Sequence, residues 1–148
     1  MNAFVETVAG STTRTRYDED TLKFIESFSI QYKYPYPYGL IMNSKGNNLD
    51  CIDCYIINNQ ELKAGEIIDC EPVGMIEMIE DNEIDHKILM AMNNGNMYDL
   101  EKIYPQIKKF IEHVFEKFDD VVIYIGKLLP KEDAVSFISG VIDSKSSI

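Results

Sequence analysis

Four carboxylates within one stretch of apolar strands constrain this chain more than any other feature. Asp50 and Asp53 come just before an apolar run, and Glu80 and Asp85 flank a polar turn between two further apolar runs. A carboxylate at the head of an apolar strand is costly to bury unless a cation or a metal compensates its charge. If the four side chains converge, they form an oxygen-ligand site suited to Mg²⁺. Lys87 beside them indicates phosphate chemistry.

Short apolar or alternating runs fill the first two thirds of the chain, and helical periodicity appears only in the last third. We expect strands over 3–9, 22–32, 52–57, 66–71, 73–80 and 86–92. Two segments interrupt them: a polar turn over 11–16 and an irregular, proline-containing segment over 34–39. The acidic turn over 81–85 closes a hairpin. We expect helices over 103–118 and 131–142, separated by a short strand over 121–125 that Gly126 ends. Many short strands before two late helices predict a small barrel with helices outside.

Composition excludes several classes of function. The 148 residues fit one domain, and the net charge of -11 argues against nucleic acid or an anionic membrane as the main partner. The aromatic run over 32–38 could form a stacking platform for single-stranded nucleic acid, but the acidic charge disfavours this alternative. No apolar run approaches the ~18 residues of a spanning helix, and the N-terminus does not resemble a signal peptide. We therefore expect a cytoplasmic protein.

The three cysteines indicate neither a disulfide framework nor a metal site. Their number is odd, and Cys51 and Cys54 form a CxxC that lies in a predicted strand. Redox motifs of this type usually open a helix, and a structural zinc site needs two more ligands at suitable spacing. We therefore expect two small, buried, apolar side chains that happen to be three residues apart.

Four motifs between residues 34 and 87 occur in a fixed order. They read YPYPYG at 34–39, NLDCID at 48–53, LKAGEIIDCEPVG at 62–74 and DHK at 85–87. In order and spacing they resemble the YPxxYG, DxDPxD, LxPGxVIxCRPxGxLxM and DxK segments of the soluble, Mg²⁺-dependent inorganic pyrophosphatases of the barrel-fold family. The resemblance implies a single domain over 1–148 of the α+β, mainly β class. Its expected core is a small five-stranded OB-like closed barrel with two C-terminal helices packed outside.

The resemblance also implies a reaction and a role for each site residue. The reaction is Mg²⁺-dependent hydrolysis of pyrophosphate by a homo-oligomer, and Asp50 would accept the proton from a metal-bridging water. The implied metal ligands are Asp53, Glu80, Asp85, Asn48 and Glu6. The side chains expected to bind phosphate are Arg14, Arg16, Tyr38 and Lys87. Independently of the family, strand alternation places Asp85 and Lys87 on one face.

The chain departs from the family pattern around the expected phosphate site. Asn48 replaces an aspartate, and Arg16 stands where the family has a glutamate. The family arginine that precedes YPxxYG has no counterpart within residues 25–27, and Val114 and Phe115 replace a tyrosine and a lysine. Losing three charge-assisted hydrogen bonds would cost roughly 5–9 kcal/mol, or on the order of 10³–10⁶ in rate.

Two outcomes of these departures stay open. Arg16, Lys33 or Lys45 could compensate and leave slow hydrolysis of pyrophosphate. Alternatively, the chain is a pyrophosphatase-fold paralogue with lost or altered activity, which binds a metal–phosphate ligand or cleaves another diphosphate.

Overall fold

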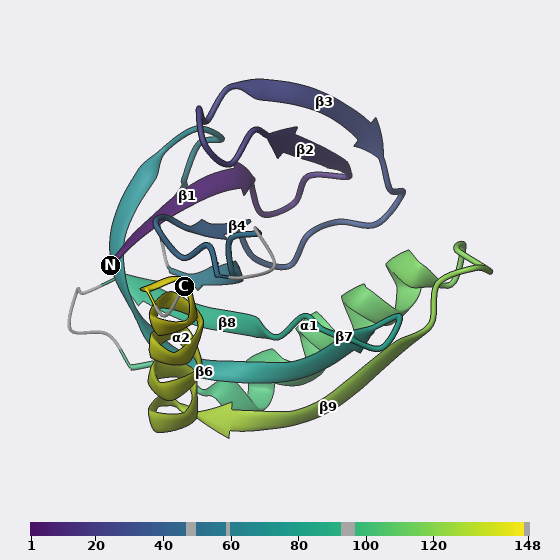
Figure 1. Cartoon of the computed structure of the whole chain (residues 1–148). Helices are drawn as coiled ribbons and strands as arrows, with labels where there is room; N and C mark the ends of the chain where they lie inside the picture. The colour runs from purple at the N-terminus through teal and green to yellow at the C-terminus, as the bar shows by residue number, and fades with distance from the viewer. Residues whose placement is uncertain (47–49, 59, 93–96, 147–148) are drawn as a thin grey trace.

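Five strands close into a ring in the computed structural model, which describes residues 1–46, 50–58, 60–92 and 97–146 (Figure 1). Around the ring they are β1 (Asn2–Thr7), β4 (Tyr38–Ile41), β5 (Asp53–Ile57), β8 (Lys87–Met92) and β6 (Ile67–Glu80), and β6 pairs back with β1. All pairs are antiparallel except β5 with β8, which is parallel. The ring confirms the expected α+β, mainly β fold built on a small closed barrel.

The long strand β6 joins the barrel to an arm beyond it. Its first residues pair with β1, its middle with β8, and its end with β7 (Glu83–Ile84) and β9 (Ile123–Pro130). We predicted two strands, 66–71 and 73–80, and this division was wrong. The register shifts by one residue between Pro72 and Gly74, so a bulge accommodates the proline without ending the strand.

Strand alternation separates the interior of the barrel from its outer face. On β5, Cys54 and Ile56 belong to the interior cluster, whereas Tyr55 and Ile57 belong to an outer one. Helix α2 (Lys131–Ser146) contributes Ala134 and Ile138 to the interior cluster. Helix α1 (Leu100–Phe115) covers the outer cluster, with side chains Ile103, Ile107, Phe110 and Ile111.

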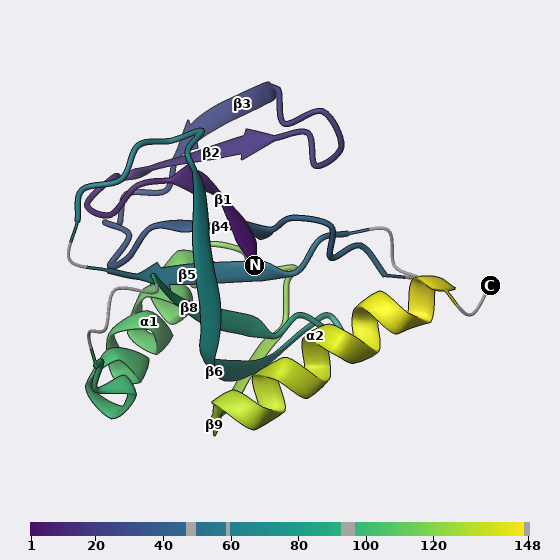
Figure 2. The same ribbon diagram turned by 90° about the vertical axis from the view of Figure 1, so that its left-hand side faces the viewer.

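Both predicted helices therefore exist and pack outside the barrel, on different sides of it (Figure 2). Helix α1 begins before the predicted residue 103 and ends at Phe115, and α2 continues past the predicted residue 142. Neither helix is long and apolar enough to cross a membrane, within the part of the chain that the structure describes.

The strands β2 (Thr13–Tyr17) and β3 (Phe24–Ser29) form a separate two-stranded sheet over β1 (Figure 1). The polar turn that we predicted over 11–16 was wrong, because Thr13, Thr15 and Tyr17 alternate with arginines as in a strand. The strand predicted over 22–32 exists as the shorter β3. All six of its residues are exposed, so its apolar side chains do not contribute to the core.

Three boundaries differ from the sequence prediction. The chain is already a strand at Tyr38, within the segment expected to be irregular. The acidic hairpin is closed by only Asp81 and Asn82, whose φ angles of 50° and 69° fit a tight two-residue turn. The strand expected to end at Gly126 continues to Pro130, because Gly126 lies against Glu77 on the neighbouring β6.

Gly39 permits the close pairing of β1 with β4, and replacing it tests this register. An alanine Cβ there would lie 1.8 Å from the carbonyl oxygen of Phe4. We expect Gly39→Ala to lower the free energy of unfolding by about 3 kcal/mol or more, since two backbones must separate. The control Gly140→Ala, in an open position on α2, should raise it by about 0.5–1 kcal/mol. Urea denaturation measures both, and an unchanged midpoint for Gly39→Ala would contradict the β1–β4 register.

Candidate active site

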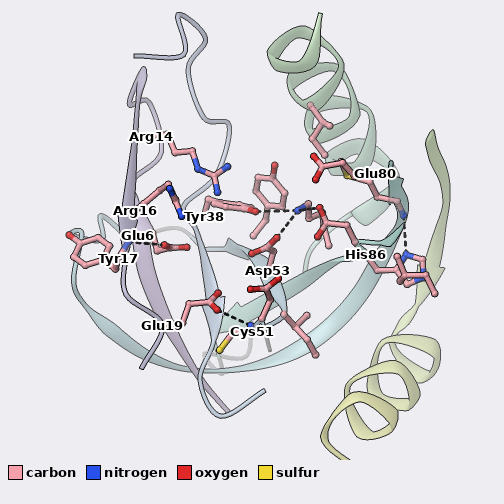
Figure 3. Close-up of a pocket in the computed structure, with 18 of the residues that line it drawn as sticks. Glu6, Arg14, Arg16, Tyr17, Glu19, Tyr38, Cys51, Asp53, Glu80 and His86 are labelled. Carbon is pink, nitrogen blue, oxygen red and sulfur yellow. Dashed lines mark hydrogen bonds and ion pairs between the residues drawn. The ribbon is translucent and has the colours of Figure 1, made fainter. Parts of the chain in front are cut away.

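One pocket of about 550 Å³ collects the predicted site residues on the outer face of the barrel (Figure 3). It lies among the ends of β5 and β8, the sheet β2–β3 and helix α1. Asn48 falls outside the described residues. The other nine predicted residues all line this pocket: Glu6, Arg14, Arg16, Tyr38, Asp50, Asp53, Glu80, Asp85 and Lys87.

Lys87 forms the centre of the pocket. Its buried ammonium lies 2.7 Å from a carboxylate oxygen of Asp53 and 3.0 Å from one of Asp85. It also donates a hydrogen bond of 3.2 Å to the hydroxyl of Tyr38. These contacts arise because β5 and β8 run parallel with Cys54 beside Ile88, so Asp53 starts one strand where Lys87 starts the other.

The pKa values show which charges this cluster stabilises. Burial alone would lower the pKa of Lys87, but Asp53, Tyr38 and Asp85 raise it well above its usual value. Burial alone would raise the pKa of Asp53, and the Lys87 ammonium and its hydrogen bond bring it below the usual value. Burial raises the pKa of Asp85 to about 6 despite the same ammonium. The cluster therefore favours the charged forms of Lys87 and Asp53, and Asp85 is the more easily protonated carboxylate.

Glu6 joins the barrel to the sheet β2–β3. It lies on β1, is buried, and accepts the backbone N–H of Tyr17 at 3.3 Å. Burial raises its pKa to about 7, although the Tyr17 hydrogen bond and nearby Arg14 favour the ionised form. The side chain lines the pocket beside Arg14 and Asp53, whose charges both affect this pKa.

Two arginines reach the pocket from β2 (Figure 3). The Arg14 guanidinium lies 5.6 Å from the ring centroid of Tyr38, within range of a cation–π contact. Its pKa stays above the usual value because Tyr38, Tyr34 and Asp53 outweigh the effect of burial. Arg16, two residues along the same strand, forms an ion pair of 2.6 Å with Glu26 of β3.

Helix α1 supplies only apolar side chains to the pocket. These are Phe110, Ile111, Val114 and Phe115. The sequence placed Val114 and Phe115 where the family pattern has a tyrosine and a lysine, and both do line the pocket. The wall formed by α1 therefore carries no cation for a phosphate.

The sequence analysis missed several residues of this pocket. Glu19 accepts the backbone N–H of Cys51 at 3.1 Å and so lies beside Asp50. Its one signal is the acidic run 18–20, which looks like an ordinary polar turn. His86, to which the sequence analysis gave no role, also lines the pocket, and its Nδ1 accepts the backbone N–H of Met78 at 3.0 Å.

The donor set of the pocket fits a divalent cation in its chemistry. Nine carboxylates line the pocket against four lysines and arginines, so an anionic ligand meets net repulsion unless a cation accompanies it. The described ranges hold no preformed group of three possible ligand residues, and Asp53 and Asp85 both contact Lys87. Mg²⁺ keeps several waters and needs only one or two carboxylates besides substrate phosphate, so two such side chains suffice.

The CxxC pair behaves as a pair of small apolar side chains. Cys51, Cys54 and Cys70 are all free and buried. This confirms the prediction made from their strand context.

Comparison with known proteins agrees with the motifs. The profile of the inorganic pyrophosphatase family matches residues 3–144. The inorganic pyrophosphatase of Saccharolobus solfataricus is 28% identical over 129 residues, covering 82% of this chain and 75% of that protein. That of Nanoarchaeum equitans is 26% identical over 146 residues, covering 92% and 91%. That of Synechocystis is 36% identical over 106 residues, covering 69% and 62%.

Solved structures share the fold. The inorganic pyrophosphatase from Helicobacter pylori superposes with a TM-score of 0.87 at 17% identity, covering 99% of this chain and 93% of that one. The enzyme from Thermus thermophilus gives a TM-score of 0.81 at 18% identity, covering 99% and 91%. The family profile extends from β1 to α2 and so spans the whole barrel and both helices. This chain belongs to the inorganic pyrophosphatase family, whose members are hydrolases that split pyrophosphate into two phosphates.

Proposed function

We propose that this protein hydrolyses inorganic pyrophosphate with Mg²⁺ as its cofactor. The observation that carries the proposal is the buried Lys87, held by Asp53, Asp85 and Tyr38 in a pocket that two arginines also line. Acidic groups for metal ions and cationic groups for phosphate thus occur side by side, as hydrolysis of a metal–pyrophosphate complex requires.

Each described residue has a proposed role. Lys87, Arg14 and Arg16 contact phosphate oxygens, and Tyr38 orients Lys87 by its hydrogen bond. Metal ions held by Asp53 and Asp85, with Glu80 and Glu6 on the pocket walls, would neutralise phosphate charge and acidify the attacking water. Asp50, exposed at the pocket wall, accepts the proton of that water. Asn48 remains a proposed metal ligand outside the described residues.

A second candidate function rests on the wall formed by α1. Four apolar side chains there provide contacts for an organic group and no cation for a second phosphate. This wall favours the alternative of a paralogue that binds a metal–phosphate ligand or cleaves another diphosphate.

We also propose a cytoplasmic homo-oligomer. The three free, buried cysteines are consistent with a reducing compartment. The exposed apolar side chains at the end of the β6–β7–β9 arm provide area for contact between copies, namely Ile79, Ile84, Val122 and Tyr124.

Phosphate release from pyrophosphate, with and without Mg²⁺, tests the main proposal. We expect release only with Mg²⁺. Failure to release phosphate in either condition, with binding of pyrophosphate still measurable, would favour the paralogue.

Replacing Asp50 tests the proposed base. We expect Asp50→Asn to lower kcat by about 10²–10⁴, the contribution usual for general-base catalysis, because the amide cannot accept the proton. Thermal unfolding and Mg²⁺ binding should stay close to wild type. Asp69→Asn, an exposed substitution outside the pocket, is the matched control. An unchanged kcat for Asp50→Asn would require a different base.

Metal binding predicts a shift in thermal stability. Mg²⁺ that binds only the folded state at 100 times its Kd should stabilise the protein by about 2.7 kcal/mol, and Tm should rise accordingly. Asp53→Asn should abolish the shift, and Asp69→Asn should retain it. Comparing each variant with and without Mg²⁺ cancels the effect of the substitution on the apo protein. A shift that survives Asp53→Asn would remove this residue from the metal site.

The α1 wall predicts how activity should respond to restored polar groups. We expect wild-type hydrolysis to be slow, and Val114→Tyr/Phe115→Lys to raise kcat/KM by about tenfold, since one charge-assisted hydrogen bond contributes ~1.5–3 kcal/mol. Val135→Tyr, at an exposed position on α2, is the control for adding a phenol. A double variant that hydrolyses no faster than wild type would contradict the weak-site interpretation.

A further inference from the structure

Arg16 and Glu26 face each other across the sheet β2–β3. They are direct register partners, and a terminal nitrogen of Arg16 lies 2.6 Å from a carboxylate oxygen of Glu26. Strand pairing therefore brings the two residues opposite each other, and their half-exposed side chains meet there.

The two partners differ in their relation to the pocket. Arg16 lines the pocket, whereas Glu26 is not among the residues that line it. A guanidinium carries five N–H donors in a rigid plane, so one contact with a carboxylate leaves donors for a second anion. Glu26 thus holds Arg16 from outside the pocket wall.

The ion pair is not needed to hold the sheet β2–β3 on the barrel. Both side chains are 49% exposed, and exposed ion pairs contribute little to stability. The sheet is attached by other bonds: the backbone N–H of Thr15 donates to the Thr7 hydroxyl at 3.1 Å, and that of Tyr17 donates to Glu6. A role in orientation accounts for the close Arg16–Glu26 contact where stability does not.

The pair also links two departures that look unrelated in the sequence. The first departure is Arg16 itself, which stands where the family pattern has a glutamate. The second is the missing family arginine within residues 25–27, the segment that contains Glu26. The register places both at one cross-strand position, with the cation on β2 and the carboxylate on β3.

We propose that Glu26 is a positioning residue that orients the Arg16 guanidinium toward a phosphate group of the substrate. This inference rests on the proposed function of the pocket and adds a residue to it. Without the carboxylate, Arg16 samples several rotamers, and the entropy of ordering it opposes phosphate binding. The expected consequence is weaker substrate binding with little change in the chemical step.

The test compares Glu26→Gln, Glu26→Asp, Arg16→Ala and Arg16→Ala/Glu26→Gln with wild type. We expect Glu26→Gln to raise KM for magnesium pyrophosphate about 3- to 10-fold with kcat nearly unchanged, because a neutral amide oxygen replaces the carboxylate that attracts the Arg16 guanidinium. Glu26→Asp should retain part of the affinity. In the Arg16→Ala background, Glu26→Gln should add nothing, because Glu26 acts through Arg16.

A control and a second readout separate this proposal from the proposed function. Glu71→Gln breaks the Lys131–Glu71 ion pair, whose partners are similarly exposed and do not line the pocket, and should change neither KM nor stability. Calorimetric binding of methylenediphosphonate with Mg²⁺ should weaken by the same 3- to 10-fold in Glu26→Gln. This binding measurement can be made even if the wild-type protein is inactive. Such inactivity would refute the proposed hydrolysis of pyrophosphate, and the positioning role of Glu26 would still be tested.

Three results would overturn the positioning role. The first is unchanged affinity in Glu26→Gln while Arg16→Ala weakens it. The second is tighter binding in Glu26→Gln, which would mean that Glu26 competes with phosphate for Arg16. The third is an equal effect of Glu26→Gln with and without Arg16.

Discussion

The buried ammonium of Lys87 is the interaction on which the rest of this site depends. Two carboxylates meet at its nitrogen, Asp53 at the start of β5 and Asp85 just before β8, and the Tyr38 hydroxyl on β4 accepts a hydrogen bond from it. A buried charge of this kind is tolerated only with its partners, and removing one partner typically costs about 3–5 kcal/mol. The cluster therefore fixes how β4, β5 and β8 sit relative to one another at the floor of the pocket, and it keeps a cation ready for phosphate.

Structural units with different chemistry surround this floor. The barrel contributes Glu6, Asp53 and Lys87, the sheet β2–β3 and its turn contribute Arg14, Arg16 and the acidic run 18–20, and helices α1 and α2 contribute apolar side chains. The nine carboxylates that line the pocket would repel a free anion, which supports the proposal that the substrate binds together with a metal ion. Three of the four cations in the pocket come from β2 and β8, the fourth is Lys45, and helix α1 supplies none, so the proposed phosphate recognition does not involve α1. This asymmetry explains why the affinity of the site should depend strongly on the orientation of Arg16.

Predictions from residue pattern succeeded where side-chain alternation alone decides the outcome, and failed where pairing decides it. Alternation placed Asp85 and Lys87 on one face, and both contact each other in the structure. The same reasoning missed β2, because its polar residues look like a turn and only the pairing with β3 makes the segment a strand. It also divided β6 at Pro72, since a bulge forms only when a neighbouring strand shifts its register. Glu19 escaped notice because only the folded chain brings the acidic run 18–20 beside Cys51.

The sequence by itself determined the class of fold, the family, and most of the acidic and basic groups that line the pocket, because these depend on residue type, order and spacing. The tertiary structure alone decided how those groups are paired. It placed Lys87 between two carboxylates, set Glu26 behind Arg16, and aligned the apolar face of α1 with the pocket. The reason is physical: the Arg16–Glu26 and Lys87–Asp53 contacts join residues 10 and 34 positions apart, and their geometry follows from strand register, which no local pattern specifies.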